Sequence, residues 1–188
     1  MQAHKIEITT WGIDDHPYPE AVFDWIRDTW HDLYDDHGAR TNSLKRFWCH
    51  FDLRDTDYSV SLCGHSYAKG KTIVCDDRGE LRGIPLWIHL HTTDSLMYTY
   101  ASTKLSNIIS ADRPFTGHYM DNVLLEPVRK FYNHVTDISY QELMDQCMDA
   151  WVAAYVEDWR YLYTDDGLRD LCEVNDYQFT ADGAFCPD

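Results

Sequence analysis

SYQELMDQCMDAWVAAYVEDWRYLY, residues 139–163, is the longest helix-like stretch in this chain of 188 residues. Apolar side chains recur in it every three or four residues, the spacing of a helix with one face in a core. Ser139 is a favourable N-cap, and Glu142 three residues later completes a capping box. The stretch therefore predicts a long C-terminal helix with this apolar stripe: Leu143, Cys147, Trp151, Ala154 and Trp159 or Leu162.

The N-terminal part of the chain predicts one strand and one helix. Residues 4–11 alternate polar and apolar side chains, as in a half-buried strand. Residues 19–34 have helical spacing, and Gly38 follows as a C′ residue that would end this helix. The apolar face of the helix is predicted to contain Val22, Trp25, Ile26, Trp30 and Leu33.

The middle of the chain has the alternation of antiparallel strands. Pro127 predicts that any helix over 119–132 is short or kinked. Thr164 is expected to cap a short helix that ends near Val174, before a tail with a turn at Asp182-Gly183. The predicted strands cover 47–53, 58–67, 72–75, 85–92 and 96–101, with a turn at 54–57.

These elements together predict an α+β protein. A mostly antiparallel sheet would be flanked by the N-terminal helix and the long C-terminal helix. No repeat, low-complexity segment or linker divides the chain, so residues 1–188 are predicted to form a single domain.

The charge is unusual, with 32 Asp and Glu against 16 Lys and Arg and a net charge of −16. The content of 44% hydrophobic and 14% aromatic residues argues against disorder. An acidic surface repels nucleic acid and anionic membranes and attracts basic proteins. We therefore expect no direct binding to nucleic acid or membrane, and a basic protein surface as the partner.

The six cysteines favour reduced thiols in the cytoplasm, because the N-terminal sequence has neither a basic leader nor an apolar run. No segment approaches the ~20 apolar residues of a membrane-spanning helix. The chain also lacks Gly-rich phosphate loops, a Gly-x-Ser-x-Gly elbow and an HExxH pair. We accordingly expect neither an enzyme nor a bound cofactor.

A metal site is the alternative that the histidines leave open. Cys63 with His65, and His89 with His91, each place two ligands on one face of a predicted strand. Adjacent strands could join the two pairs into a zinc site, which would suit a small metal-dependent enzyme. Ten histidines also generate such pairs by chance, so we predict that zinc is absent.

The first predicted helix carries the candidate partner-binding residues. Its carboxylates follow each other at i, i+4, ~6 Å apart along the axis, close to the interval between phosphates on a nucleic-acid strand. Like charges at this spacing destabilise a helix slightly. They could imitate nucleic acid toward a protein that grips phosphates, or they could only keep the protein soluble. The candidate residues are Glu20, Asp24, Asp28, Asp32, Asp35 and Asp36.

The C-terminal sequence adds a resemblance. Residues 161–166, YLYTDD, and 175–183, NDYQFTADG, resemble the ending of small acidic phage and prophage proteins often labelled "antitoxin of toxin–antitoxin stability system". Those proteins also open with a strand and a helix. Gly167 departs from the group, which usually has a helix former there. The resemblance implies a mobile-element origin and an accessory role, without catalytic residues to carry over.

Charge and resemblance together lead to one main functional hypothesis. The protein would be a phage-encoded inhibitor in the cytoplasm of an infected bacterium. It would bind a host nucleic-acid-handling defence complex, such as a CRISPR effector or a restriction enzyme, in place of nucleic acid. An antitoxin-like protein that binds a basic toxin is the second hypothesis, and the metal-dependent enzyme is the third.

Overall fold

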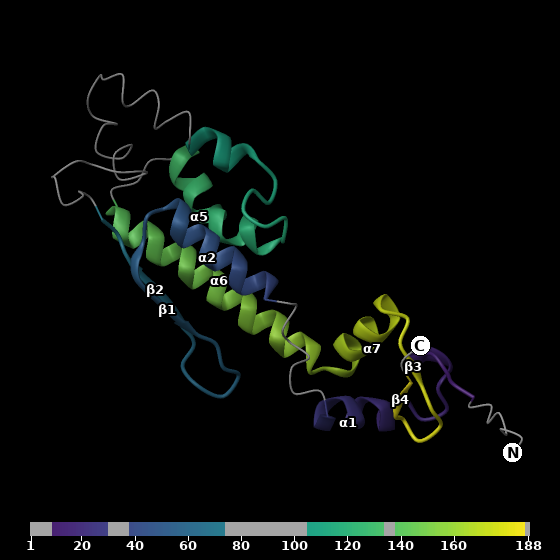
Figure 1. Ribbon diagram of the computed structural model, residues 1–188. Coiled ribbons are helices and arrows are strands. Elements are labelled where there is room, and N and C mark those ends of the chain that lie inside the picture. The colour runs from purple at the N-terminus through teal and green to yellow at the C-terminus, as the bar shows by residue number, and fades with distance from the viewer. Residues whose placement is uncertain (1–8, 30–37, 74–104, 134–137, 187–188) are drawn as a thin grey trace, which may run out of the picture. The chain divides into compact units, whose positions relative to one another are not determined.

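The computed structural model describes residues 9–29, 38–73, 105–133 and 138–186 (Figure 1). The chain divides into a smaller unit, residues 1–35 and 157–188, and a larger unit, residues 36–156. Each unit has its own cluster of buried apolar side chains. The single domain stays a prediction, because two compact units can still unfold together.

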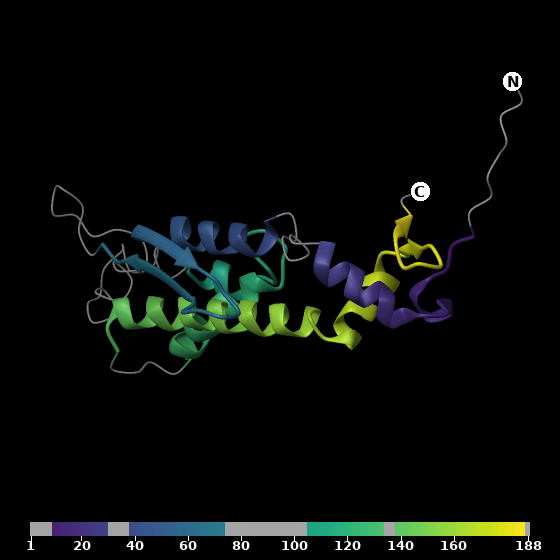
Figure 2. The same cartoon turned by 90° about the horizontal axis from the view of Figure 1, so that it is seen from below.

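Three helices and a hairpin make up most of the larger unit. The helices are α2 (Ala39–His50), α5 (Met120–Asn133) and α6 (Tyr140–Leu162), of which α6 passes into the smaller unit after Val156. α2 and α6 run side by side, with the hairpin along one side of the pair and α5 on the other (Figures 1 and 2). Residues 105–110 form a further helical turn before α5.

The long helix begins as its sequence predicts. The backbone N–H of Ser139 donates to the Glu142 carboxylate at 2.7 Å, and the N–H of Glu142 donates to Ser139 Oγ at 3.2 Å. Hydrogen bonding from the Ser139 backbone N–H and side chain to the carboxylate favours its charged form and lowers the pKa of Glu142. The capping box is therefore confirmed.

The apolar stripe of α6 faces the core of the larger unit. Tyr140, Leu143, Met144, Cys147, Met148 and Trp151 are all buried. Two polar contacts fix their register. The Tyr140 hydroxyl donates to the Phe51 carbonyl at 3.0 Å, and the Trp48 indole N–H donates to Met148 Sδ at 3.3 Å.

The strand predicted over 47–53 is wrong, because Phe47 to His50 belong to α2. Apolar residues in this region fit a period of two, but Leu44, Phe47, Trp48 and Phe51 also fit helical spacing. All four are buried. Because the helical pattern extends back to Leu44, it gives a longer buried face than a strand would.

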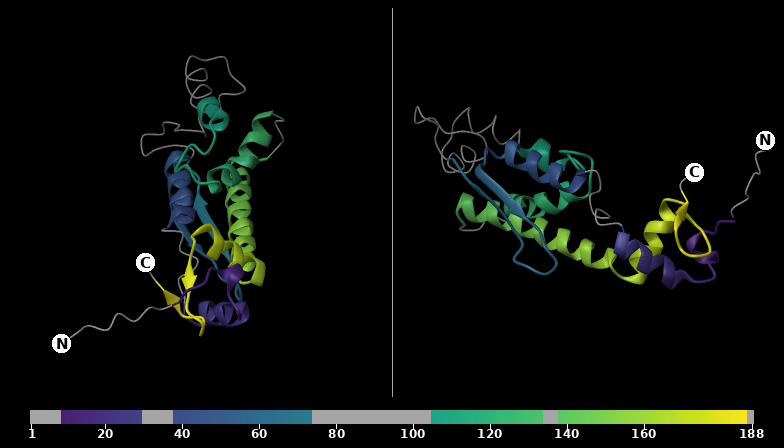
Figure 3. Two further views of the ribbon diagram at one scale, coloured as in Figure 1. Left: turned by 90° about the vertical axis from the view of Figure 1, so that its right-hand side faces the viewer. Right: turned by 60° about the horizontal axis from the view of Figure 1, so that its bottom comes forward.

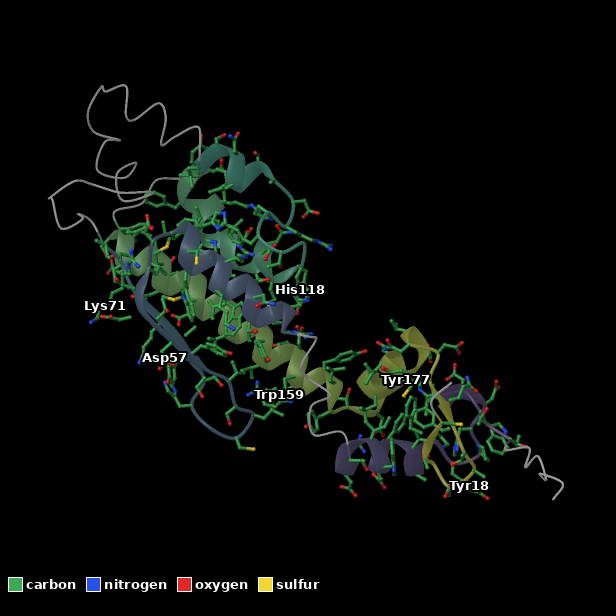
Figure 4. The ribbon with its side chains drawn as sticks, viewed as in Figure 1. Tyr18, Asp57, Lys71, His118, Trp159 and Tyr177 are labelled. Carbon is green, nitrogen blue, oxygen red and sulfur yellow. The ribbon has the colours of Figure 1, made fainter. Side chains whose placement is uncertain are left out.

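The hairpin is displaced from its predicted position. β1 (Arg54–Ser59) pairs antiparallel with β2 (Tyr67–Lys71), with Tyr58 opposite Ala68. The predicted turn at 54–57 is instead an irregular part of β1, where the register shifts and Asp55 has a φ of 49°. Its turn-like composition reflects this bulge. Asp57 and Lys71 are on the exposed side of the hairpin (Figure 4).

α5 continues through Pro127 over 14 residues, so the helix is not short; a kink at Pro127 stays a prediction. Proline removes one backbone hydrogen bond from a helix. Burial outweighs this loss: Leu124, Leu125, Val128 and Phe131 flank the proline and pack into the core.

Thr72 and Ile73 lie outside any strand, contrary to the strand predicted over 72–75. The Thr72 N–H donates to Gln141 Oε1 at 2.8 Å instead of entering a ladder. The rest of that stretch and the strands predicted over 85–92 and 96–101 lie outside the described residues.

The smaller unit combines the two ends of the chain (Figure 3). Its elements are a 3₁₀ turn η1 (Ile13–Asp15), the helices α1 (Pro19–Thr29) and α7 (Asp165–Val174), and the short strands β3 (Gln178–Phe179) and β4 (Phe185–Cys186). Trp11 exchanges two backbone hydrogen bonds of 2.9 Å with Phe179. Of the predicted N-terminal strand, Trp11 thus makes an isolated bridge, while residues 4–8 lie outside the description.

The helix ends of the smaller unit largely follow the sequence. Thr164 caps α7 by accepting the Gly167 N–H at 3.1 Å, as predicted. Gly183 has a φ of 86° in the turn that joins β3 to β4. Gly38 is left-handed too, with a φ of 73°, but it directly precedes α2. α1 matches the predicted helix as far as Thr29, after which residues 30–37 are not described.

The fold is thus a mixture of helices and antiparallel hairpins, which confirms the coarse α+β prediction. Both sheets in the described residues have two strands. The described residues do not form the predicted larger sheet flanked by helices.

Candidate interaction surface

The core of the smaller unit determines which side of α1 is exposed. Val22, Phe23 and Ile26 are buried and pack with Leu168 and Cys172 of α7. The acidic residues of α1 lie on the other side of the helix and are exposed: Glu20, Asp24 and Asp28. Their placement agrees with the predicted acidic face. Asp32, Asp35 and Asp36 lie outside the described residues.

Arg27 connects this acidic face to the region after α6. Its guanidinium contacts Asp24 at 3.4 Å, forms an ion pair with Asp165, and donates to the Tyr163 carbonyl at 3.3 Å. The Asp24 carboxylate stays 77% exposed despite this contact. An exposed pair of this kind contributes little to stability, so Arg27 leaves most of the acidic face available to solvent.

α7 carries a second acidic surface, which was not predicted from the sequence. Leu168 and Cys172 turn inward, which leaves the intervening acids exposed. These acids are Asp165, Asp166, Asp170 and Glu173. A charge count by segment would have found them, because residues 157–182 contain eight Asp and Glu but two Arg.

The two units differ strongly in charge. Among the described residues of the smaller unit, 9–29 and 157–186, thirteen side chains are Asp or Glu and three are Arg. In the described part of the larger unit, nine Asp and Glu are balanced by nine Lys and Arg. The acids of the smaller unit are Asp14, Asp15, Glu20, Asp24, Asp28, Glu157, Asp158, Asp165, Asp166, Asp170, Glu173, Asp176 and Asp182.

Acidic groups in the smaller unit are close enough to affect each other. The charge of Asp14 is the main cause that raises the pKa of Glu173, followed by partial desolvation, a hydrogen bond with Asp14 and the charge of Asp170. Arg169 opposes this effect, and it pairs with Asp14 at 2.6 Å. The crowding opposes folding of this unit near neutral pH.

This repulsion gives a prediction for Glu173→Gln. A carboxyl whose pKa is raised by folding contributes stability below its unfolded pKa and loses it as pH rises through the folded pKa. The amide removes the repulsive charge, so the variant should melt at a higher temperature than wild type near neutral pH. The difference should shrink as the pH falls through the carboxyl range. A melting series over pH checks this, and a gain that persists in acid would contradict it.

The structure describes only one of the two residue pairs that could bind zinc. Cys63 and His65 are exposed in the loop between β1 and β2, and His89 and His91 lie outside the described residues. Within the described ranges, no group of three or more His, Cys, Asp or Glu side chains is placed to hold a metal ion. The absence of zinc stays a prediction.

No protein-family model, curated protein or solved structure matches this chain. No helix among the described residues is both long enough and apolar enough to cross a membrane.

Proposed function

We propose that this protein binds a basic protein surface through its smaller unit, at a place where the partner otherwise holds nucleic-acid phosphates. The observation that carries the proposal is the separation of net charge between the described parts of the two units, thirteen acids against three Arg in the smaller unit and nine acids against nine Lys and Arg in the larger. A need for solubility alone would be met by a net negative charge spread over both units. Concentrated charge produces a directed field, which steers an oppositely charged partner.

The geometry of α1 supports imitation of nucleic acid. Glu20, Asp24 and Asp28 are exposed on one helix, with successive carboxylates ~6 Å apart along its axis. Carboxylates at that interval on one helix offer lysines and arginines a row of anions. The exposed acids of α7 add to the acidic surface that was predicted from α1.

The biological setting that suits this proposal is a phage-encoded inhibitor in the cytoplasm of an infected bacterium. CRISPR effectors and restriction enzymes have basic channels for nucleic acid and would be partners of the right chemistry. This part of the proposal rests on the resemblance of the C-terminal sequence to small acidic phage proteins.

Two variants with equal changes of charge test the proposal. One replaces Glu20, Asp24 and Asp28 by their amides in the smaller unit. The matched control replaces Asp52, Glu126 and Asp149 by amides in the larger unit. Partners captured from bacterial lysate would be purified, and their association rates with each variant measured over a range of ionic strength.

We expect the smaller-unit variant to associate about tenfold more slowly than wild type at low salt, because steering can accelerate encounter by ten-fold or more. The rate should also depend less on salt than that of wild type. The control should associate like wild type, and duplex DNA or RNA should compete for the partner. Equal rates for both variants, or no competition by nucleic acid, would refute the proposal.

A further inference from the structure

Exposed aromatic side chains in the smaller unit suggest where its partner makes closest contact. Among the described residues, four large hydrophobic side chains are strongly exposed, and all belong to this unit: Tyr18, Tyr161, Tyr163 and Val174. Tyrosine is enriched where protein interfaces are strongest. Two of the four, Tyr161 and Tyr163, lie at the junction where α6 ends and α7 begins.

Tyr161 is held in place at this junction. Its hydroxyl donates a short hydrogen bond of 2.5 Å to the Asp170 carboxylate, across the junction on α7. Its carbonyl accepts the Thr164 hydroxyl at 2.6 Å and the Thr164 N–H at 2.9 Å. The side chain nevertheless stays exposed, at 47% for the residue. An aromatic ring fixed before binding loses little conformational entropy when a partner covers it.

The charges around Tyr161 indicate the chemistry of its ligand. The hydrogen bond to Asp170 is the main cause that raises the pKa of the Tyr161 hydroxyl, followed by desolvation and by the charges of Asp170 and Asp166. Two cations of the smaller unit already have acidic partners: Arg27 contacts Asp24, Asp165 and the Tyr163 carbonyl, and Arg169 pairs with Asp14. An apolar partner would have to desolvate these carboxylates without pairing them, which is costly. A cation is the complementary group.

We propose that the α6–α7 junction, with Tyr161, Asp166 and Asp170, receives an arginine side chain of the partner. The planar guanidinium can stack on an aromatic ring and donate to carboxylates at the same time, whereas lysine offers a compact and strongly hydrated charge. This inference rests on the proposed function, because it names the contact by which a basic surface is recognised. Arginine is also the side chain that most often grips phosphate in a bidentate way.

Oligo-arginine and oligo-lysine peptides of equal length are suitable probes. Their dissociation constants would be measured calorimetrically for wild type, Tyr161→Leu and Tyr161→Phe. Tyr18→Leu is the matched control, because Tyr18 is 64% exposed in the same unit but precedes α1. Circular dichroism establishes that each variant is folded, and the comparison of the two peptides on wild type tests the contact even if the leucine variant fails to fold.

We expect wild type to bind oligo-arginine more tightly than oligo-lysine. Tyr161→Leu should weaken oligo-arginine binding about two- to fivefold, the size of an exposed cation–π contact, and should reduce the preference over lysine. Tyr161→Phe keeps the ring and should bind almost as wild type does, as should Tyr18→Leu.

The outcomes separate this inference from the proposed function. If wild type binds oligo-arginine but Tyr161→Leu binds it equally well, the arginine contact is refuted while a basic partner remains supported. Equal affinity of wild type for the two peptides refutes the contact in the same way. If wild type binds neither peptide, the contact and the proposed function are both refuted.

Discussion

Trp151→Ala is expected to lower the free energy of unfolding of the larger unit by about 3–5 kcal/mol, the usual cost of truncating a buried tryptophan. Trp151 is fully buried on α6 and contacts the rings of Tyr58 and Tyr155. Its indole N–H donates to the Arg40 carbonyl at 3.1 Å. Alanine would therefore leave a cavity between α6, the hairpin and α2, and would remove that hydrogen bond. Denaturant unfolding followed by circular dichroism measures the loss.

Trp151→Phe separates the two contributions. Phenylalanine fills most of the cavity but cannot donate to Arg40, so its loss should be clearly smaller than that of alanine. Val152→Ala on the same helix is the control, because Val152 is only partly buried. A Trp151→Ala protein with the stability of wild type would show that α6 does not pack as described.

The long helix could be predicted from sequence because local and tertiary signals agree there. The capping box at Ser139 and Glu142 is local, and the buried apolar stripe from Tyr140 to Trp151 has a single period over about three turns. Phe47 to Leu53 gave the opposite result, because so short an apolar run fits a strand as well as a helix. Whether the strand period or the helical period prevails depends on the part of the protein's own core against which the segment packs. A pattern of a few residues does not contain that information.

The candidate surface was partly predictable for a similar reason. Periodicity within one helix was enough to find Glu20, Asp24 and Asp28, since their spacing is local. The acids of α7 lie about 140 residues further along the chain. They share a unit with α1 only because Leu168 and Cys172 pack against Val22, Phe23 and Ile26. That pairing is a tertiary contact, which the spacing of residues along the chain does not reveal.

Gly167→Ala is expected to destabilise the smaller unit strongly, although alanine has a higher helix propensity than glycine. Alanine in place of glycine inside a helix normally gains about 1 kcal/mol. A Cβ at Gly167, however, would lie 2.1 Å from the Tyr161 carbonyl oxygen and 2.7 Å from its carbonyl carbon. Both are backbone atoms, so no side chain can rotate away. We expect the smaller unit to lose about 3 kcal/mol, at the upper end of the usual range for overpacking.

Hydrogen exchange of the α7 amides measures this loss within the smaller unit. Asp166→Ala is the control, because Asp166 is exposed in the same helical turn, and its replacement should change stability by at most about 1 kcal/mol. Faster exchange in Gly167→Ala than in the control would also explain why this helical position has glycine despite its low helix propensity. α7 approaches the Tyr161 backbone so closely that only glycine, which has no Cβ, fits at position 167. Slower exchange would mean that the helix propensity of alanine outweighs the close contact with the Tyr161 backbone. The α6–α7 junction, which positions Tyr161, could then shift without a loss of stability.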